Sequence, residues 1–276
     1  MQKQPIIAFM GCGNMAQSLI SGLVESGFDR THIWATDRNL EKRERVKSKF
    51  GIQTESDNLK AAKLADILIL AVKPKDMHGL ITELKEIIPA EKHLTISIAT
   101  GIQTHHLERW MGSHVSIVRA MPNTPALLRA GATGLYANAK VTEEQKNIAE
   151  SLIRAVGIAV WVDHEQDLDI IAALSGSGPA YFFLMMEALQ QSAEALGLSN
   201  NTARLLTLQT ALGAARMALE SDITLDALRK KVASPGGITE RALQNLESGG
   251  IRALFNNALT TAKDRSIEIS QLFDKE

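Results

Sequence analysis

The sequence predicts an α/β protein with two unlike halves, a parallel doubly wound sheet in the first and helices alone in the second. Short apolar runs alternate with amphipathic ones as far as about residue 163, and the strand pattern is absent after that point. A glycine-rich turn also follows the first apolar run. Because 276 residues exceed a typical single domain, we expect two domains, residues 1–163 and residues 164–276.

The expected strands of the first half are short apolar runs. They are Ile6–Met10, Ile33–Thr36, Ile67–Val72, Leu94–Ala99, Val115–Met121, Gly131–Ala137 and Val160–Val162. The helices between them are Gln17–Ser26, Leu40–Phe50, Asn58–Lys63, Leu80–Ile88 and Glu143–Val156. In the second half we expect helices at Gln166–Ala173, Ala180–Leu196, Thr202–Leu219, Leu225–Val232, Thr239–Glu247 and Ile251–Leu272. In such a sheet the carboxyl ends of the strands form one edge, which is where ligands bind.

The turn after the first strand reads Gly11-Cys12-Gly13-Asn14-Met15-Ala16. Gly11 permits a tight turn, Gly13 lets the backbone approach a pyrophosphate, and the following helix offers unpaired N–H groups. The pattern alone is weak, but its place between an N-terminal strand and a helix indicates a Rossmann-type dinucleotide-binding domain. Cys12 has no base near it in sequence, so we interpret it as a small loop residue rather than a nucleophile.

The end of the second strand points to two different nicotinamide cofactors. Asp37 could bind a ribose 2′-hydroxyl, which favours NADH, whereas Arg38 could pair with the 2′-phosphate of NADPH. Arg38 forms a polar cluster with Thr36 and Asn39, and Asp37 could instead start or cap the next helix. We therefore expect NADPH, with NADH as the alternative. The charged run Glu41–Arg45 is interpreted as a solvated helix face.

Two further strand ends should face the same edge of the sheet, Ala71–Pro74 and Ser97–Gly101. Small residues there would let a flat nicotinamide ring lie against the backbone, and Pro74 fixes the turn. Lys73 follows a buried strand, and we interpret it as a surface or cofactor contact rather than a catalytic group.

A second glycine-rich turn, Ser234-Pro235-Gly236-Gly237-Ile238-Thr239, precedes a helix near the other end of the chain. The backbone N–H groups of Gly236, Gly237 and Ile238 could hold a small carboxylate, with a further hydrogen bond from the Ser234 hydroxyl. The alternative is a turn and N-cap that only joins two helices. Together with a dinucleotide-binding loop, the turn suggests a reductase of a small acid.

Five segments, taken in order, carry a resemblance to a known family. They are Gly11–Ala16, Ala71–Pro74, Met121–Pro125, Leu174–Tyr181 and Val232–Thr239. The chain resembles the pyrroline-5-carboxylate reductases over nearly its whole length, and the last two segments with Leu246–Gly250 are the specific ones. The resemblance implies reduction of 1-pyrroline-5-carboxylate to L-proline with NAD(P)H, the last step of proline synthesis. It also implies an intertwined dimer through the C-terminal helices, often assembled into larger rings.

The resemblance also implies roles for residues by position. Pyrophosphate contacts would be Met10, Gly11, Cys12, Gly13, Asn14 and Met15; a ribose or adenine contact would be Asn58; nicotinamide-side contacts would be Ala71, Val72, Lys73, Pro74, Ile98, Ala99 and Thr100. The substrate carboxylate would lie at Ser234, Gly236, Gly237, Ile238 and Thr239, with Glu165 beside the substrate pocket. Thr239 is the expected catalytic residue, since its hydroxyl could orient the imine and assist protonation, with solvent as the alternative proton source.

In two places the chain departs from the family pattern. Ile238 stands where the family commonly has a small residue or threonine, so we expect its side chain to point away and its N–H to bind. The Asp37-Arg38 pair differs from the small polar version of some relatives, which leaves the cofactor preference open.

Composition limits the classes of partner and ligand that we expect. The 30 basic and 31 acidic residues nearly balance, which gives no reason to expect nucleic acid or an anionic membrane. No apolar run is expected to approach the ~20 residues that span a bilayer, and the start of the chain predicts no signal peptide, so we expect a cytoplasmic protein. One cysteine excludes an internal disulfide, the histidines lack metal-ligand spacing, and we expect no metal. His105 and His106 are interpreted as a surface pair at a helix entry.

Two other functions remain open. One is a related imine or 2-oxoacid reductase of the same two-domain build, such as a β-hydroxyacid dehydrogenase. That class needs a lysine acid on the first C-terminal helix, and Ala180–Leu196 contains no lysine. The other is a dinucleotide-sensing protein that has lost catalysis, which the intact Ser234–Thr239 and Leu174–Tyr181 segments argue against.

Overall fold

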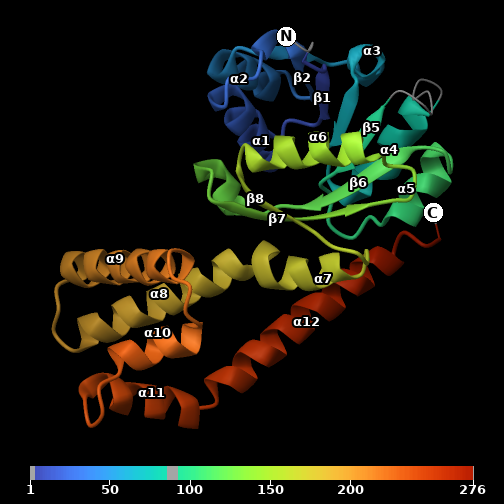
Figure 1. Ribbon diagram of the computed structural model, residues 1–276. Coiled ribbons are helices and arrows are strands. Elements are labelled where there is room, and N and C mark those ends of the chain that lie inside the picture. Colours follow the sequence, from blue (N-terminus) through green and yellow to red (C-terminus); the bar gives the residue numbers. More distant parts are fainter. Residues whose placement is uncertain (1–3, 86–92, 276) are drawn as a thin grey trace. The chain divides into compact units, whose positions relative to one another are not determined.

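A computed structural model describes residues 4–85 and 93–275 of the chain (Figure 1). The chain forms two compact units, one of Met1–Ser177 with Thr261–Glu276 and one of Gly178–Thr260. The expected functional division at residue 163 is a separate matter and stays a prediction.

The first unit contains one sheet with strand order β3-β2-β1-β4-β5-β6-β7-β8. Its strands are β1 (Ile7–Met10), β2 (Ile33–Thr36), β3 (Gln53–Glu55), β4 (Ile67–Leu70), β5 (Leu94–Ser97), β6 (Ser116–Met121), β7 (Gly131–Ala137) and β8 (Gly157–Trp161). The expected doubly wound fold is confirmed with one correction, since β7 runs antiparallel to β6. The segment between them holds only the short helix η2 (Thr124–Leu128), and a parallel crossover needs a dozen or more residues.

Helices cover the sheet of the first unit. They are α1 (Asn14–Glu25), η1 (Arg30–His32), α2 (Leu40–Phe50), α3 (Asn58–Leu64), α4 (Pro74–Leu84), α5 (Thr104–Met111), α6 (Glu143–Arg154), α7 (Asp167–Ile171) and the π-helix η3 (Ala172–Gly176). The expected start of α4 at Leu80 is wrong, because Pro74 occupies the first turn, where proline is favoured. The expected end of that helix at residues 86–88 lies outside the described residues.

Alternate residues of β1 enter two different hydrophobic clusters. Ile7 and Phe9 pack in the cluster that includes Leu19 of α1, and Ala8 with Met10 packs in the cluster that includes Met77 of α4. All four β1 residues are fully buried, as expected for a central parallel strand covered on both faces. The glycine loop therefore starts from a rigid support.

The second unit contains helices only. They are α8 (Gly178–Ala195), α9 (Asn200–Leu219), α10 (Leu225–Val232), α11 (Ile238–Ser248) and the beginning of α12 (Ile251–Gln271), whose end belongs to the first unit. The expected all-helical second half is confirmed. Between Gly178 and Thr260 the only fully buried residues are Gly178 and Ala203, while apolar side chains such as Phe182 and Leu205 are exposed.

Candidate functional site

The glycine loop leaves β1 at the centre of the sheet, between β2 and β4. Gly11 has φ +114°, and a Cβ there would lie 2.8 Å from the Ala71 carbonyl oxygen, so the backbone passes where only glycine fits. The Gly11 N–H donates to the Thr36 carbonyl at 2.9 Å. Gly13 is the N-cap of α1, and among the described residues no side chain caps this helix. The first-turn N–H groups of α1 are therefore available to an anion.

The Asp37 carboxylate ties β2 to the glycine loop. Its Oδ1 accepts from the Asn39 N–H at 2.9 Å, its Oδ2 accepts from the Cys12 N–H at 3.4 Å, and Lys42 Nζ lies 3.5 Å from Oδ2. The suggestion that Asp37 caps the next helix is wrong, because the Asn39 side chain accepts from the Lys42 N–H at the start of α2.

A cavity of about 340 Å³ opens where β1, β2 and β4 end. From the predicted cofactor contacts it brings together Gly11, Cys12, Gly13, Thr36, Asp37, Arg38, Asn58, Ala71, Val72 and Lys73, and it adds Lys42, Lys75, Asp76 and Leu80. The predicted contacts Met10, Asn14, Met15, Pro74, Ile98, Ala99 and Thr100 do not line it. Four cationic side chains and two carboxylates give the lining a positive balance, which suits phosphate groups.

Lys42 and Arg43 correct the interpretation of the Glu41–Arg45 run as a solvated face. Lys42 lines the cavity, and Arg43 Nη1 donates to the Asp37 carbonyl at 2.7 Å and to the Arg38 carbonyl at 3.3 Å. The first turn of α2 follows the end of β2 directly, so its side chains reach the ligand edge. Their position directly after the end of β2 is the sequence signal for a place at this edge.

The side chains of Met10 and Cys12 are buried in the first unit. Met10 is fully buried, and its Sδ lies 3.7 Å from Thr36 Oγ1. Cys12 is also buried, and burial, followed by the nearby Asp37 carboxylate, raises the pKa of the Cys12 thiol to about 11. The thiol therefore stays protonated near neutral pH, which agrees with its interpretation as a small loop residue.

Asn58 is held at the cavity by two elements. Thr36 Oγ1 donates to Asn58 Oδ1 at 2.6 Å, and Asn58 Nδ2 donates to Glu83 Oε2 at 3.0 Å. The Thr36 hydroxyl and the Asn58 amide thus reach the cavity as one hydrogen-bonded pair.

Glu165 serves a network inside the first unit. Its Oε1 accepts from the Thr104 N–H and from Arg119 Nη1, both at 2.6 Å, and its Oε2 accepts from the Thr104 hydroxyl. The Arg119 side chain is 6% exposed and that of Glu165 is 17% exposed. Both carboxylate oxygens are thus engaged by the protein, and the contact of Glu165 with substrate stays a prediction.

The Met121–Pro125 and Leu174–Tyr181 segments meet in the first unit. Asn123 Nδ2 donates to the Ser175 carbonyl at 3.0 Å, and Asn123 Oδ1 accepts from the Ala132 N–H at 2.9 Å. A Cβ on Gly176 would lie 2.9 Å from the Met121 methyl carbon. These contacts favour a structural use of the two segments.

The second glycine-rich turn lies in the second unit, between α10 and α11. Gly236 has φ +70°, the Gly237 N–H donates to the Ser234 carbonyl at 3.0 Å, and the Gly236 N–H donates to Glu240 Oε2 at 2.8 Å. Two of the three predicted donors are thus engaged inside the turn. Ile238 is the first residue of α11, where a backbone N–H has no partner within the helix, so its N–H is the third predicted donor that could serve an anion.

Glu240 was not singled out in the sequence. Its carboxylate accepts from the Gly236 N–H, which is one of the donors that we predict for the substrate carboxylate. A carboxylate can therefore bond to this turn, and an incoming ligand would compete with Glu240 for the Gly236 N–H. The signal was the acidic residue in the first turn of the following helix.

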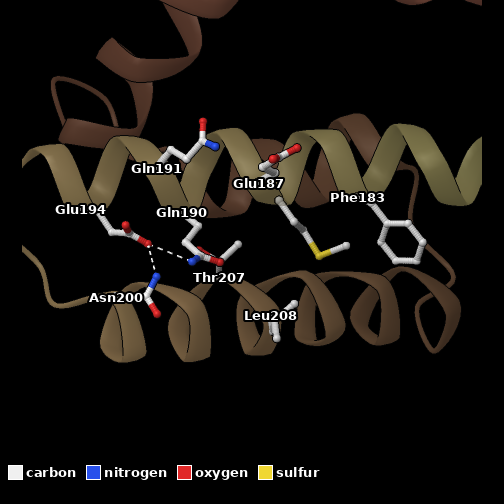
Figure 2. A pocket seen from close by; sticks show the side chains of 9 residues that line it. Phe183, Glu187, Gln190, Gln191, Glu194, Asn200, Thr207 and Leu208 are labelled. Carbon is white, nitrogen blue, oxygen red and sulfur yellow. Dashed lines mark hydrogen bonds between the residues drawn. The ribbon is translucent and has the colours of Figure 1, made fainter.

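A further hollow of about 460 Å³ lies between α8 and α9 (Figure 2). Gln190 and Asn200 both donate to Glu194 Oε1, at 2.8 and 2.9 Å. The remaining lining residues are Phe183, Met186, Glu187, Gln191, Thr207 and Leu208. None of these was a predicted site residue, and the hollow lies on the exposed helical surface of the second unit.

His105, His106 and Asp274 form the one group in the described chain with the composition of a metal site. The Gln103 N–H donates to His106 Nδ1 at 3.1 Å, so the ring proton is on Nε2, which faces Asp274 Oδ1 at 2.8 Å. A metal-bound histidine would carry its proton on the other nitrogen, facing an acceptor. The cluster therefore does not suit a metal. The interpretation of His106 as a surface residue is wrong, since its side chain is 0% exposed.

Comparison with known proteins agrees with this geometry. Residues 6–101 match the family described as NADP oxidoreductase coenzyme F420-dependent, and residues 165–269 match pyrroline-5-carboxylate reductase dimerisation. Fold, cavity and these matches define an NAD(P)H-dependent oxidoreductase.

The relatives narrow the class further. The chain is 48% identical to a pyrroline-5-carboxylate reductase of Pseudomonas aeruginosa, with 97% of each chain covered. A solved pyrroline-5-carboxylate reductase from Coxiella burnetii is 52% identical with a TM-score of 0.93, covering 97% of this chain and 99% of that one. A Plasmodium falciparum pyrroline carboxylate reductase with NADP bound is 30% identical with a TM-score of 0.87, covering 98% and 100%. The chain belongs to the pyrroline-5-carboxylate reductase family.

The dimerisation match indicates self-association. It also includes an apolar helical stretch of the chain. The expectation that no apolar run approaches membrane-spanning length is wrong. Helices α7, η3 and α8 form one helical stretch, Asp167–Ala195, that is long and apolar enough to cross a membrane by length and composition alone. This is weak evidence for a membrane, because the whole stretch falls within the residues that match the dimerisation family, and an apolar surface there also suits protein contacts.

Proposed function

We propose that this chain reduces 1-pyrroline-5-carboxylate to L-proline by hydride transfer from NADPH, the last step of proline biosynthesis. The observation that carries the proposal is the dinucleotide cavity at the ends of β1, β2 and β4, in a chain 48% identical to a pyrroline-5-carboxylate reductase over 97% of its length.

The residues of the cavity fit a nicotinamide dinucleotide. Gly11 leaves no room for a side chain, and the uncapped start of α1 offers N–H groups to a pyrophosphate. When bound, the cofactor supplies the hydride. Arg38 and Lys42 favour a 2′-phosphate, and Asp37 is already bonded by two backbone N–H groups, so it repels phosphate less than a free carboxylate would. NADPH is therefore the proposed cofactor, with NADH as the alternative.

Positioning dominates the proposed mechanism. A protonated cyclic imine is electrophilic enough to accept hydride without a strong enzyme acid. The Ile238 N–H, the Ser234 hydroxyl and, once Glu240 is displaced, the Gly236 N–H hold the substrate carboxylate at the start of α11. The Thr239 hydroxyl orients the imine nitrogen, and Thr239 or solvent supplies the proton.

The helical region serves self-association in this proposal. Its exposed apolar side chains become buried in a dimer through the C-terminal helices, which can assemble further into a ring. We propose the functional division at residue 163, with residues 164–276 as the substrate-binding and dimerisation domain, and a cytoplasmic location.

The test is oxidation of NADPH and of NADH, followed by absorbance, with and without 1-pyrroline-5-carboxylate, together with identification of the product. Proline formation with NADPH as the better reductant supports the proposal. Turnover of other imines or of 2-oxoacids instead would favour the related reductases, and cofactor binding without any turnover would favour a sensor. Thr239→Ala should lower kcat more than cofactor affinity, and Thr261→Ala, at an exposed position of α12, is the matched control.

A further inference from the structure

The loop between β5 and α5 carries the predicted nicotinamide-side contacts Ile98, Ala99 and Thr100. The Ile98 N–H donates to the Leu70 carbonyl at 3.2 Å, so the loop begins as a continuation of the sheet. Ala99 is buried, and Thr100 is only partly exposed. What fixes the far end of the loop decides how firmly this surface is held.

The last turns of α12 pack against that far end. Gly101 has φ +79°, and a Cβ there would lie 2.5 Å from Ile269 Cγ2 and 3.5 Å from the Ser270 nitrogen. Glycine is needed at this position both for the backbone conformation and for the approach of α12. The loop and the end of α12 are therefore fitted to each other.

A hydrogen-bond relay joins the C-terminal segment to the backbone of the same loop. Asp274 Oδ1 accepts from His106 Nε2 at 2.8 Å, and His106 Nδ1 accepts from the N–H of Gln103 at 3.1 Å. Gln103 ends the loop and is the N-cap of α5. The buried ring of His106 thus transmits the position of a C-terminal carboxylate to the loop.

Further contacts show that the C-terminal segment is well anchored rather than frayed. Arg109 Nη2 donates to the Phe273 carbonyl at 2.6 Å, and Arg109 Nη1 donates to the Asp274 carbonyl at 3.1 Å. Phe273 is 8% exposed and lies edge-on to Trp110. Ser266 Oγ donates to Asp169 Oδ1 at 2.7 Å, and both residues are buried. Chain ends are usually loose unless tied down in this way.

We infer that the C-terminal segment Ile269–Asp274 is a positioning element for hydride transfer, which holds the Ile98–Thr100 surface through Gly101 and through the His106 relay to Gln103. The inference rests on the proposed function. A merely structural clasp would affect stability alone, whereas a positioning element affects the chemical step at unchanged cofactor affinity.

The test compares three variants of the full chain. Asp274→Ala removes the acceptor for His106, and Asp274→Asn keeps an oxygen acceptor. Glu268→Gln is the control, since Glu268 on α12 pairs with Arg265 and, among the described residues, with no other side chain. We expect Asp274→Ala to lower kcat on the order of tenfold, because small misplacements of reacting groups are costly. The Kd for NADPH should change by less than about threefold, and the isotope effect with NADPH deuterated at the transferred position should rise. Asp274→Asn should recover most of the rate, and Glu268→Gln should match the wild type.

An unchanged kcat and isotope effect in Asp274→Ala would overturn the inference. So would a loss of rate accounted for by the unfolded fraction that circular dichroism measures at the assay temperature. The failure of the proposed function is distinguishable, because wild-type protein would then bind NADPH without forming proline. In that case the fluorescence of bound NADPH tests whether the C-terminal segment positions the nicotinamide. Emission that differs between Asp274→Ala and the wild type supports the inference, and identical emission refutes it.

Discussion

Replacement of Glu165 by alanine gives the sharpest test of the network that holds the start of α5. The change leaves the guanidinium of Arg119, which is 6% exposed, without its carboxylate, and leaves two donors of Thr104 without an acceptor. Breaking a buried ion pair from one side costs about 3–5 kcal/mol, and a stranded amide costs about 1–3 kcal/mol. Because Glu165 is 17% exposed, water can replace part of what is lost, so we expect about 3 kcal/mol of destabilisation in all.

Urea unfolding at one fixed protein concentration measures this loss, because self-association makes stability depend on concentration. Arg119→Met and the double variant complete a double-mutant cycle with Glu165→Ala. The double variant should be less destabilised than the sum of the single changes, with a coupling energy of at least about 1 kcal/mol. A loss of less than about 1 kcal/mol in Glu165→Ala, or strict additivity, would refute the reasoning.

The same position tests the predicted contact with substrate. Glu165→Gln keeps the size and one oxygen acceptor but removes the charge. If the variant folds with nearly wild-type stability and has a raised KM for 1-pyrroline-5-carboxylate, the carboxylate also serves the substrate. A wild-type KM would leave Glu165 with the structural role alone.

Three other perturbations have expected outcomes. Gly11→Ala should weaken NADPH binding and lower the free energy of unfolding by about 1–3 kcal/mol, because an L-residue is strained at φ +114° and meets a backbone carbonyl; wild-type affinity by titration would contradict this. Burial lowers the pKa of His106 below its ordinary value of 6.5, so on acidification the unfolded chain takes up a proton before the folded chain does. As the pH drops below about 6.5, the free energy of unfolding should therefore decrease, by less than about 1.4 kcal/mol per pH unit. Urea melts at several pH values check this, and His106→Gln should reduce the slope. Arg38→Ala and Lys42→Ala should each raise the KM for NADPH about tenfold and change the KM for NADH little. If a variant raised both KM values equally, the replaced residue would not bind the 2′-phosphate.

Much of the fold could be predicted because its signals are local. The apolar run of β1, the glycines after it and the helix that follows lie within twenty residues of one another, and each favours the same turn. The direction of β7 could not be predicted from its own sequence, since alternation gives a strand but no partner. The signal was the length of the connection, which is too short for a parallel crossover.

The part of the site that could not be predicted from the sequence depends on contacts between residues far apart in the chain. Asp274 lies 168 residues from His106, and Glu165 lies 46 residues from Arg119. No spacing rule relates such pairs, so the sequence alone does not show that the histidine at the start of α5 is buried. His106 becomes buried once the segment with Phe273 and Asp274 packs on α5.

The Asp37-Arg38 pair shows how chemistry at a strand end depends on hydrogen bonding as well as residue type. An acid at the end of β2 usually indicates NADH, because a free carboxylate binds the ribose and repels a phosphate. Here the carboxylate accepts from the Cys12 and Asn39 N–H groups and lies near Lys42, so much of its charge is already compensated. The cationic side chains then set the electrostatic preference of the cavity, and the acid serves to fix the glycine loop. The cofactor preference should therefore follow Arg38 and Lys42 rather than the presence of Asp37.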